Sequence, residues 1–264
     1  MRVLCVGDVC GEIGLRMAGR HLNTLKSQYE ADLTVVNGEN ADGVGLKPEQ
    51  ARFLRRHGAD VITLGNHTWG RRQIASALDE CDGIIRPHNL APGLPGTGVW
   101  LATMPSGRIL AVVNLLGRLN CVWNADSPFS VMEQLLAQNP ADYYLVDFHG
   151  EATSEKAAFA HCFDGRASAV FGTHTHVQTS DEQILPNGTG FITDVGMTGA
   201  ATSILGVLPE QSVNMFLGGF PQTLRAPESG PAKLEGVVFE IDDESGTCLS
   251  VERLRIFDKL GESI

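Results

Sequence analysis

Residues 1–40, MRVLCVGDVCGEIGLRMAGRHLNTLKSQYEADLTVVNGEN, contain the unit that decides the fold class. The apolar run Arg2–Gly7 predicts a strand, Leu15–Tyr29 carries Leu and Met at helical spacing, and Leu33–Val36 predicts a second strand. Strands that alternate with helices in this way are typical of α/β proteins with a buried sheet. Each of the two strands is followed by polar residues of a kind that can bind a metal ion.

The same alternation of strands and helices continues along the chain, and two predicted hairpins interrupt it. Further strands are predicted at Asp60–Leu64, Tyr143–Phe148 and Ala167–Phe171. Further helices are predicted from Pro48 to Gly58, at Pro128–Gln138 and at Ser154–Phe163. Two pairs of apolar runs flank turn residues and predict antiparallel hairpins, namely Gly98–Thr103 with Ile109–Leu115 across Pro105-Ser106-Gly107, and Leu234–Ile241 with Leu249–Ile256. A pure Rossmann topology is therefore not expected. No internal repeat divides the chain, so we expect one domain over residues 1–264.

Composition restricts the partners and the location. The chain has a formal charge of −11 and no long run of Lys or Arg, which argues against long DNA or RNA as a partner. No apolar stretch is long enough to span a membrane, and the N-terminal apolar run meets Asp8 too soon for a signal peptide. The six cysteines lack paired CxxC spacing, so we expect reduced thiols in a cytoplasmic protein. The sequence does not decide whether the chain forms a homo-oligomer.

Residues that can bind metal ions recur at the C-terminal ends of five predicted strands. They are Asp8, Glu39, Asn40, Asn66, His149, His174 and His176. Ligands of open α/β sheets bind at this edge, so the side chains are expected to meet there. Each residue also has a structural explanation, because Asp and Asn often form turns and a lone His at a strand end is commonly structural. All five strand ends together favour a metal site.

The types of side chain indicate which ions would bind. Carboxylate, amide and imidazole ligands without a thiolate favour Fe or Mn, with Zn as an alternative. Seven ligands exceed one tetrahedral site and predict two ions roughly 3.5–4 Å apart, bridged by one carboxylate. Such a pair clamps the attacking and leaving oxygens of an in-line displacement at phosphorus. It also supplies the positive charge that this acidic chain lacks.

Several blocks resemble the calcineurin-like metallophosphoesterases. They are Gly7-Asp8, Gly38-Glu39-Asn40, Gly65-Asn66-His67, His149 and Gly172-Thr173-His174-Thr175-His176. That family usually bridges its metals with the Asp of a GDxxD block, where this chain has Glu39-Asn40. This departure is typical of one branch, the YmdB-like phosphodiesterases. The chain resembles that branch over nearly its whole length, most clearly in the longer blocks at 65–69, 147–156, 172–179 and 193–199. Two further departures, Gly150 and His88, remove no ligand, and His88 affects only the expected rim of the pocket.

The resemblance implies a sandwich of two facing mixed β-sheets flanked by α-helices, with both ions at the sheet edge. By the same resemblance, the ligands would be Asp8, Glu39, Asn40 and His176 for the first ion, and Glu39, Asn66, His149 and His174 for the second. Glu39 would then bridge the ions, and His67 would be the general acid. The implied activity is hydrolysis of small phosphodiesters, 2′,3′- or 3′,5′-cyclic nucleotides included, by in-line attack of a metal-bridging hydroxide.

Two alternatives stay open. A phosphomonoesterase acting on nucleotides or phosphoproteins would need more positive charge, and few Lys or Arg lie beside the ligand blocks; we expect Arg71-Arg72 to be a solvated helix start. A non-catalytic metal-binding regulator would not need His67. No predicted His–Cys geometry gives Cys10 a nucleophilic role. The remaining histidines lie in helical segments and are expected to be structural, namely His21, His57 and His161.

Overall fold

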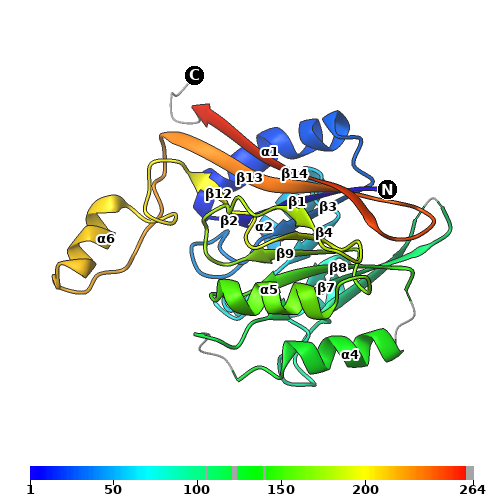
Figure 1. Cartoon of the computed structure of the whole chain (residues 1–264). Helices are drawn as coiled ribbons and strands as arrows, with labels where there is room; N and C mark the ends of the chain where they lie inside the picture. Colours follow the sequence, from blue (N-terminus) through cyan, green and yellow to red (C-terminus); the bar gives the residue numbers. More distant parts are fainter. Residues whose placement is uncertain (105, 121–123, 139–140, 260–264) are drawn as a thin grey trace.

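Two β-sheets form the centre of this computed structural model, which describes residues 1–104, 106–120, 124–138 and 141–259 (Figure 1). Within these ranges the larger sheet has eight strands in the order β2-β12-β13-β1-β3-β4-β5, with β14 beside β13. Their bounds are β1 Arg2–Val6, β2 Asp8–Val9, β3 Leu33–Asn37, β4 Val61–Thr63, β5 Ile84–Ile85, β12 Met197–Ala200, β13 Pro231–Ile241 and β14 Cys248–Lys259. The sheet is mixed, because β1 pairs parallel with β3 and antiparallel with β13.

The smaller sheet has six strands in the described part of the chain, in the order β10-β11-β9-β8-β7-β6. Their bounds are β6 Val99–Thr103, β7 Ile109–Leu116, β8 Tyr143–His149, β9 Ala169–Thr173, β10 Gln183–Ile184 and β11 Gly190–Ile192. The central strands run parallel, and the edge strands β6 and β10 pair antiparallel with their neighbours. This sheet is therefore mixed as well.

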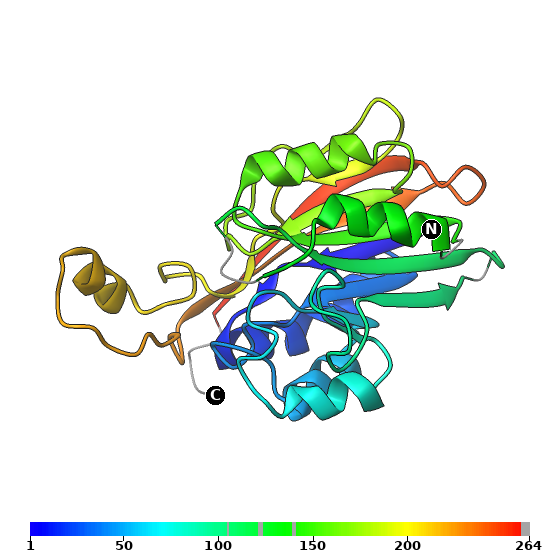
Figure 2. The same ribbon diagram turned by 90° about the horizontal axis from the view of Figure 1, so that it is seen from below.

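Helices cover the outer face of each sheet, which gives four layers (Figures 1 and 2). The helices on the larger sheet are α1 Gly11–Gln28, α2 Pro48–Arg56 and α3 Ile74–Glu80, and those on the smaller sheet are α4 Pro128–Gln138 and α5 Thr153–Cys162. A further helix, α6 Pro209–Phe216, stands away from the body in both views. No helix in the described ranges combines the length and apolar character needed to cross a membrane.

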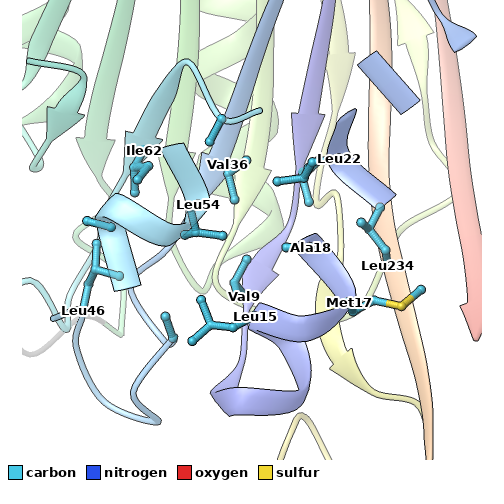
Figure 3. Close-up of a cluster of buried hydrophobic side chains, with 14 of the residues drawn as sticks. Val9, Leu15, Met17, Ala18, Leu22, Val36, Leu46, Leu54, Ile62 and Leu234 are labelled. Carbon is cyan, nitrogen blue, oxygen red and sulfur yellow. The ribbon is translucent and has the colours of Figure 1, made fainter. Parts of the chain in front are cut away.

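Alternating burial along the strands explains the layers. In β3, Val35 belongs to the core between the two sheets, whereas Val36 belongs to the core beneath the helices. Successive side chains of a strand point to opposite faces, so a strand covered on both sides is apolar throughout. Figure 3 shows Val36 in the same cluster as Leu22 of α1 and Leu54 of α2. Full burial of each such side chain stabilises the fold by about 1.5–3 kcal/mol.

The predicted fold class, two facing mixed sheets flanked by helices, is confirmed. Both predicted hairpins are antiparallel pairs, β6 with β7 and β13 with β14, although Pro105 of the first turn lies outside the described residues. Some predicted bounds are wrong: α1 begins at Gly11, β9 covers Ala169–Thr173, and β8 continues through His149. The short strands β5, β10, β11 and β12 and the helix α6 were missed, because runs of two to eight residues carry little periodic signal.

Candidate metal centre

The ends of five strands bring the predicted ligands together. Asp8 follows β1, Glu39 and Asn40 follow β3, and Asn66 follows β4 in the larger sheet; His149 ends β8, and His174 and His176 follow β9 in the smaller one. The structure therefore gathers all seven, with His67, where the edges of the two sheets meet. A cavity of about 690 Å³ opens onto this cluster, and its lining includes Glu39, Asn40, His67, His174 and His176. Neither His21, His57 nor His161 lines it.

One half of the cluster surrounds His149 Nε2. This atom lies 3.1 Å from Glu39 Oε1, 2.8 Å from Asn66 Oδ1 and 3.1 Å from His174 Nδ1. Glu39, His149 and His174 offer ligand atoms that all lie within 4.8 Å of one another. These four side chains are the set that the resemblance implies for the second ion.

The other half joins Asp8, Asn40 and His176. Asp8 is fully buried, and its Oδ1 has no hydrogen-bond partner in the described part of the chain. The nearest imidazole atom, His176 Nε2, is 3.6 Å away, and Asn40 Nδ2 lies 3.1 Å from the same nitrogen. An orphaned buried carboxylate oxygen is costly unless a cation or donor satisfies it, so these residues fit a metal ion.

Each of the three histidines has a hydrogen-bond acceptor beside its outward nitrogen. The acceptors are Thr173 Oγ1 for His149 Nδ1 at 2.8 Å, Glu151 Oε2 for His174 Nε2 at 3.1 Å, and the Leu205 carbonyl for His176 Nδ1 at 2.9 Å. A neutral imidazole carries one proton, so the nitrogen that faces the cluster then carries a lone pair. Partners of this kind fix the tautomer of metal-binding histidines.

A glycine leaves the space in which these side chains meet. A Cβ on Gly65 would lie 2.4 Å from Glu39 Oε2 and 2.4 Å from His149 Nε2. Any larger residue would therefore occupy the position of the ligand atoms. The donor set, its orphaned oxygen and this space together fit bound metal ions.

Charge within the cluster sets the protonation states. Burial raises the pKa of Asp8 and of Glu39, but the positive charge of His176 and His149 outweighs it and holds both below their ordinary values. Burial, together with His149, lowers the pKa of His174 to about 4. Burial also opposes the charged form of His149, yet Glu39 raises its pKa. A cation entering the cluster would therefore compete with a proton at His149.

The walls of the cavity contain residues that the sequence did not reveal. Arg71 lines the cavity and donates to the Asp42 carboxylate and carbonyl, whereas Arg72 is exposed as expected; the helix α3 begins only at Ile74. Arg225 also lines the cavity, from the irregular segment after α6. Only contacts between segments far apart in the sequence bring Arg71 and Arg225 here.

One further expectation about the pocket is wrong. His88 borders a separate cavity rather than the rim above the cluster. Cys10 does lie beside a histidine, with its Sγ 3.7 Å from His176 Nδ1. Burial raises the pKa of the Cys10 thiol, and His176 Nδ1 is already bonded to a carbonyl, so this pair does not form an activated nucleophile.

Two facing mixed sheets with this cluster at their common edge define a protein of the metallophosphoesterase type. The chain belongs to the YmdB-like protein family, whose family model matches residues 4–254. It is 43% identical over 261 residues to a 2′,3′-cyclic-nucleotide 2′-phosphodiesterase of Bacillus subtilis (strain 168), a match that covers 98% of each chain. The resemblance found in the sequence is thus confirmed.

Solved structures agree with this assignment. A hypothetical protein from Thermus thermophilus superposes with a TM-score of 0.90 at 43% identity, covering 98% of this chain and 100% of that one. A structure described as a novel phosphatase from Mycoplasma pneumoniae superposes with a TM-score of 0.92 at 36% identity, covering 98% and 94%. The architecture therefore extends over at least 94% of each neighbour.

Proposed function

We propose that this chain is a phosphodiesterase that uses two metal ions to hydrolyse small phosphodiesters of the cyclic-nucleotide class, 2′,3′- or 3′,5′-cyclic. One observation carries the proposal: His149, His174 and His176 each have an acceptor beside the outward ring nitrogen, and their other nitrogens lie together at the buried carboxylates Asp8 and Glu39. The activity for which the Bacillus subtilis relative is named supports a diester substrate.

The ligands divide between two ions. Asp8, Asn40 and His176 would hold one ion, Asn66, His149 and His174 the other, and Glu39 both. When bound, two ions, Fe or Mn with Zn as an alternative, would supply positive charge to the phosphoryl oxygens and lower the pKa of the attacking water. The remaining chemistry would fall to the side chains of the cavity.

His67 is placed to handle the proton of the leaving group. Its Nδ1 lies 2.9 Å from Asn40 Oδ1, an acceptor, so Nδ1 carries a proton. Its ring lines the cavity, and 37% of the side chain is exposed. In the protonated form, Nε2 would donate to the departing alkoxide as a general acid.

The arginines of the cavity wall favour one second candidate, a phosphomonoesterase. A monoester dianion needs more positive charge than a diester, and the structure supplies Arg71 and Arg225 where the sequence predicted few cations. Arg71 is paired with Asp42, however, a carboxylate that it shares with Lys47, and Arg225 is the only arginine of the lining without a carboxylate partner among the described residues. The diester therefore stays the leading candidate.

The setting of the reaction is part of the same proposal. The net charge of −11 supports a small substrate over long nucleic acid, and a cytoplasmic location would suit both that substrate and the cysteines.

The experiment compares substrates on metal-loaded enzyme. Protein loaded separately with Mn, Fe or Zn would be assayed on cyclic nucleotides, nucleoside monophosphates, bis(p-nitrophenyl) phosphate and p-nitrophenyl phosphate. We expect a higher kcat/KM for the diester of each pair. A higher value for the monoesters with every metal would replace the proposal by the second candidate.

A further inference from the structure

A buried ion pair lies directly behind the His-Thr-His segment. Lys156 of α5 is fully buried, and its Nζ donates to Asp194 Oδ2 at 2.8 Å. Asp194, between β11 and β12, is also fully buried. Neither residue lines the cavity above the cluster. Replacing a buried ion pair by apolar groups is often neutral or stabilising, so stability alone does not account for this one.

The two side chains of the pair form hydrogen bonds with the backbone on both sides of His174. Lys156 Nζ donates to the Thr173 carbonyl at 2.8 Å, and Asp194 Oδ2 accepts from the Thr175 N–H at 3.1 Å. The peptide groups that enter and leave His174 are thus tied to a single pair of charges. On the cavity side, the His174 N–H donates to Asp8 Oδ2 at 3.2 Å.

The backbone held in this way is strained. His174 has a φ of 100° and His176 a φ of 63°, values that residues with a side chain rarely adopt. Such conformations persist only where the surroundings over-determine them. Here they turn two imidazoles towards the carboxylates of the larger sheet, which an extended continuation of β9 would not do.

The packing behind the segment leaves it no room to relax. A Cβ on Gly172 would lie 2.8 Å from Lys156 Cδ and 1.8 Å from the Thr193 carbonyl oxygen. The lysine stem and the backbone before Asp194 therefore press directly on the end of β9. Val195 N–H also donates to the Gly172 carbonyl at 2.9 Å.

We propose that Lys156 and Asp194 are positioning residues that hold His174 and His176 in the geometry needed to bind the metal pair. This inference rests on the proposed function, because it assumes that the two histidines are ligands. Lys156 and Asp194 touch neither substrate nor metal, and they would act only through the backbone from Thr173 to Thr175.

The test uses the double variant Lys156→Met/Asp194→Asn, which removes both charges together and avoids leaving one buried and unpaired. The control is Lys26→Met/Asp60→Asn, an ion pair whose side chains are 30% and 32% exposed. In that pair Lys26 Nζ also binds Asp60 Oδ2, and this oxygen also accepts a backbone N–H, from Thr34 at 2.8 Å, but it lies far from the cluster. Folding would be checked by near-ultraviolet circular dichroism, and Co(II) binding by titration of its visible absorption bands.

We expect the folded double variant to bind Co(II) about 10–100-fold more weakly, as is typical when the support of a ligand is lost, with altered visible bands. The control pair should match the wild type. Should the double variant not fold, Lys156→Gln/Asp194→Asn, which also removes both charges but keeps a polar group at each position, carries the same expectation. A folded variant with wild-type affinity and spectrum would overturn this inference alone, whereas a wild-type protein that takes up no cobalt would overturn the proposed function with it.

Discussion

Thr173 Oγ1 lies 2.8 Å from His149 Nδ1, in the layer behind the metal cluster. The hydroxyl gives its own proton to Asp147 Oδ1 at 2.7 Å, so it can only accept from the imidazole. Burial raises the pKa of Asp147 to about 6, which leaves this carboxylate ionised and accepting at neutral pH. This hydroxyl thus favours the tautomer of His149 that carries its proton on Nδ1.

We therefore expect Thr173→Val, which keeps the volume but removes the hydroxyl, to weaken metal binding by about 10–100-fold. Isothermal titration with Mn(II) or Zn(II) measures this directly. Thr63→Val is the matched control, because Thr63 also donates to Asp147 but does not contact His149. Equal losses in the two variants would show that Asp147, rather than the tautomer of His149, matters.

Glu39→Gln should lower the occupancy of both ions or abolish turnover, because one carboxylate is assigned to both. The substitution keeps the size of the side chain and removes its charge. Metal content and kcat would be measured on the same preparation. Glu155→Gln, on a carboxylate that accepts backbone N–H groups of Arg118 and Leu119, should leave both unchanged. Full metal content and full activity in Glu39→Gln would exclude a bridging role.

Gly65→Ala should abolish metal binding, since the added methyl group would lie 2.4 Å from ligand atoms of Glu39 and His149. Gly150→Ala is a matched control beside the same histidine. There the closest atom, Phe148 Cε1, is 3.2 Å from the new Cβ, so a small shift relieves the contact. Comparable metal binding by both variants would mean that the cluster in the protein is wider than the structure indicates.

Sequence reasoning located the cluster because its residues follow buried strands. Asp8, Glu39 and His149 each end or follow a continuous apolar run, which is typical of a strand buried on both faces, and parallel strands bring such ends to one edge. The residues that line the cavity walls could not be predicted in the same way. Arg225 comes from an irregular segment whose course depends on α6 and on long-range contacts, so no local pattern indicates that it lines the same cavity as Arg71.

The supporting residues were missed for a related reason. Lys156 sits on a helix, where a lysine is ordinarily solvated, and only the packing of α5 against β9 buries it. In the sequence, Thr173 reads as an ordinary β-branched residue of a strand, and nothing local shows that its hydroxyl orients His149. The sequence reveals ligands by their chemistry, whereas residues that orient ligands become visible only with coordinates.

The role of His67 can be tested through the leaving group. A nucleoside hydroxyl departs as a basic alkoxide and needs a proton in the transition state, whereas p-nitrophenolate leaves without one. His67→Ala should therefore lower kcat by about 10²–10⁴-fold on a cyclic nucleotide but much less on bis(p-nitrophenyl) phosphate, with metal content nearly unchanged. His161→Ala, on the exposed end of α5, serves as the control. Equal losses on both substrates would contradict the general-acid role, and loss of metal would make His67 a ligand.

The most direct test of the account is the number of metal ions held by each chain. Protein purified without chelators would be analysed by inductively coupled plasma mass spectrometry, and its crystals by anomalous diffraction at the metal edges. Two ions per chain are expected, roughly 3.5–4 Å apart, with Glu39 between them. Fully active protein with one ion or none, or with ions elsewhere than among Asp8, His149 and His176, would contradict the account.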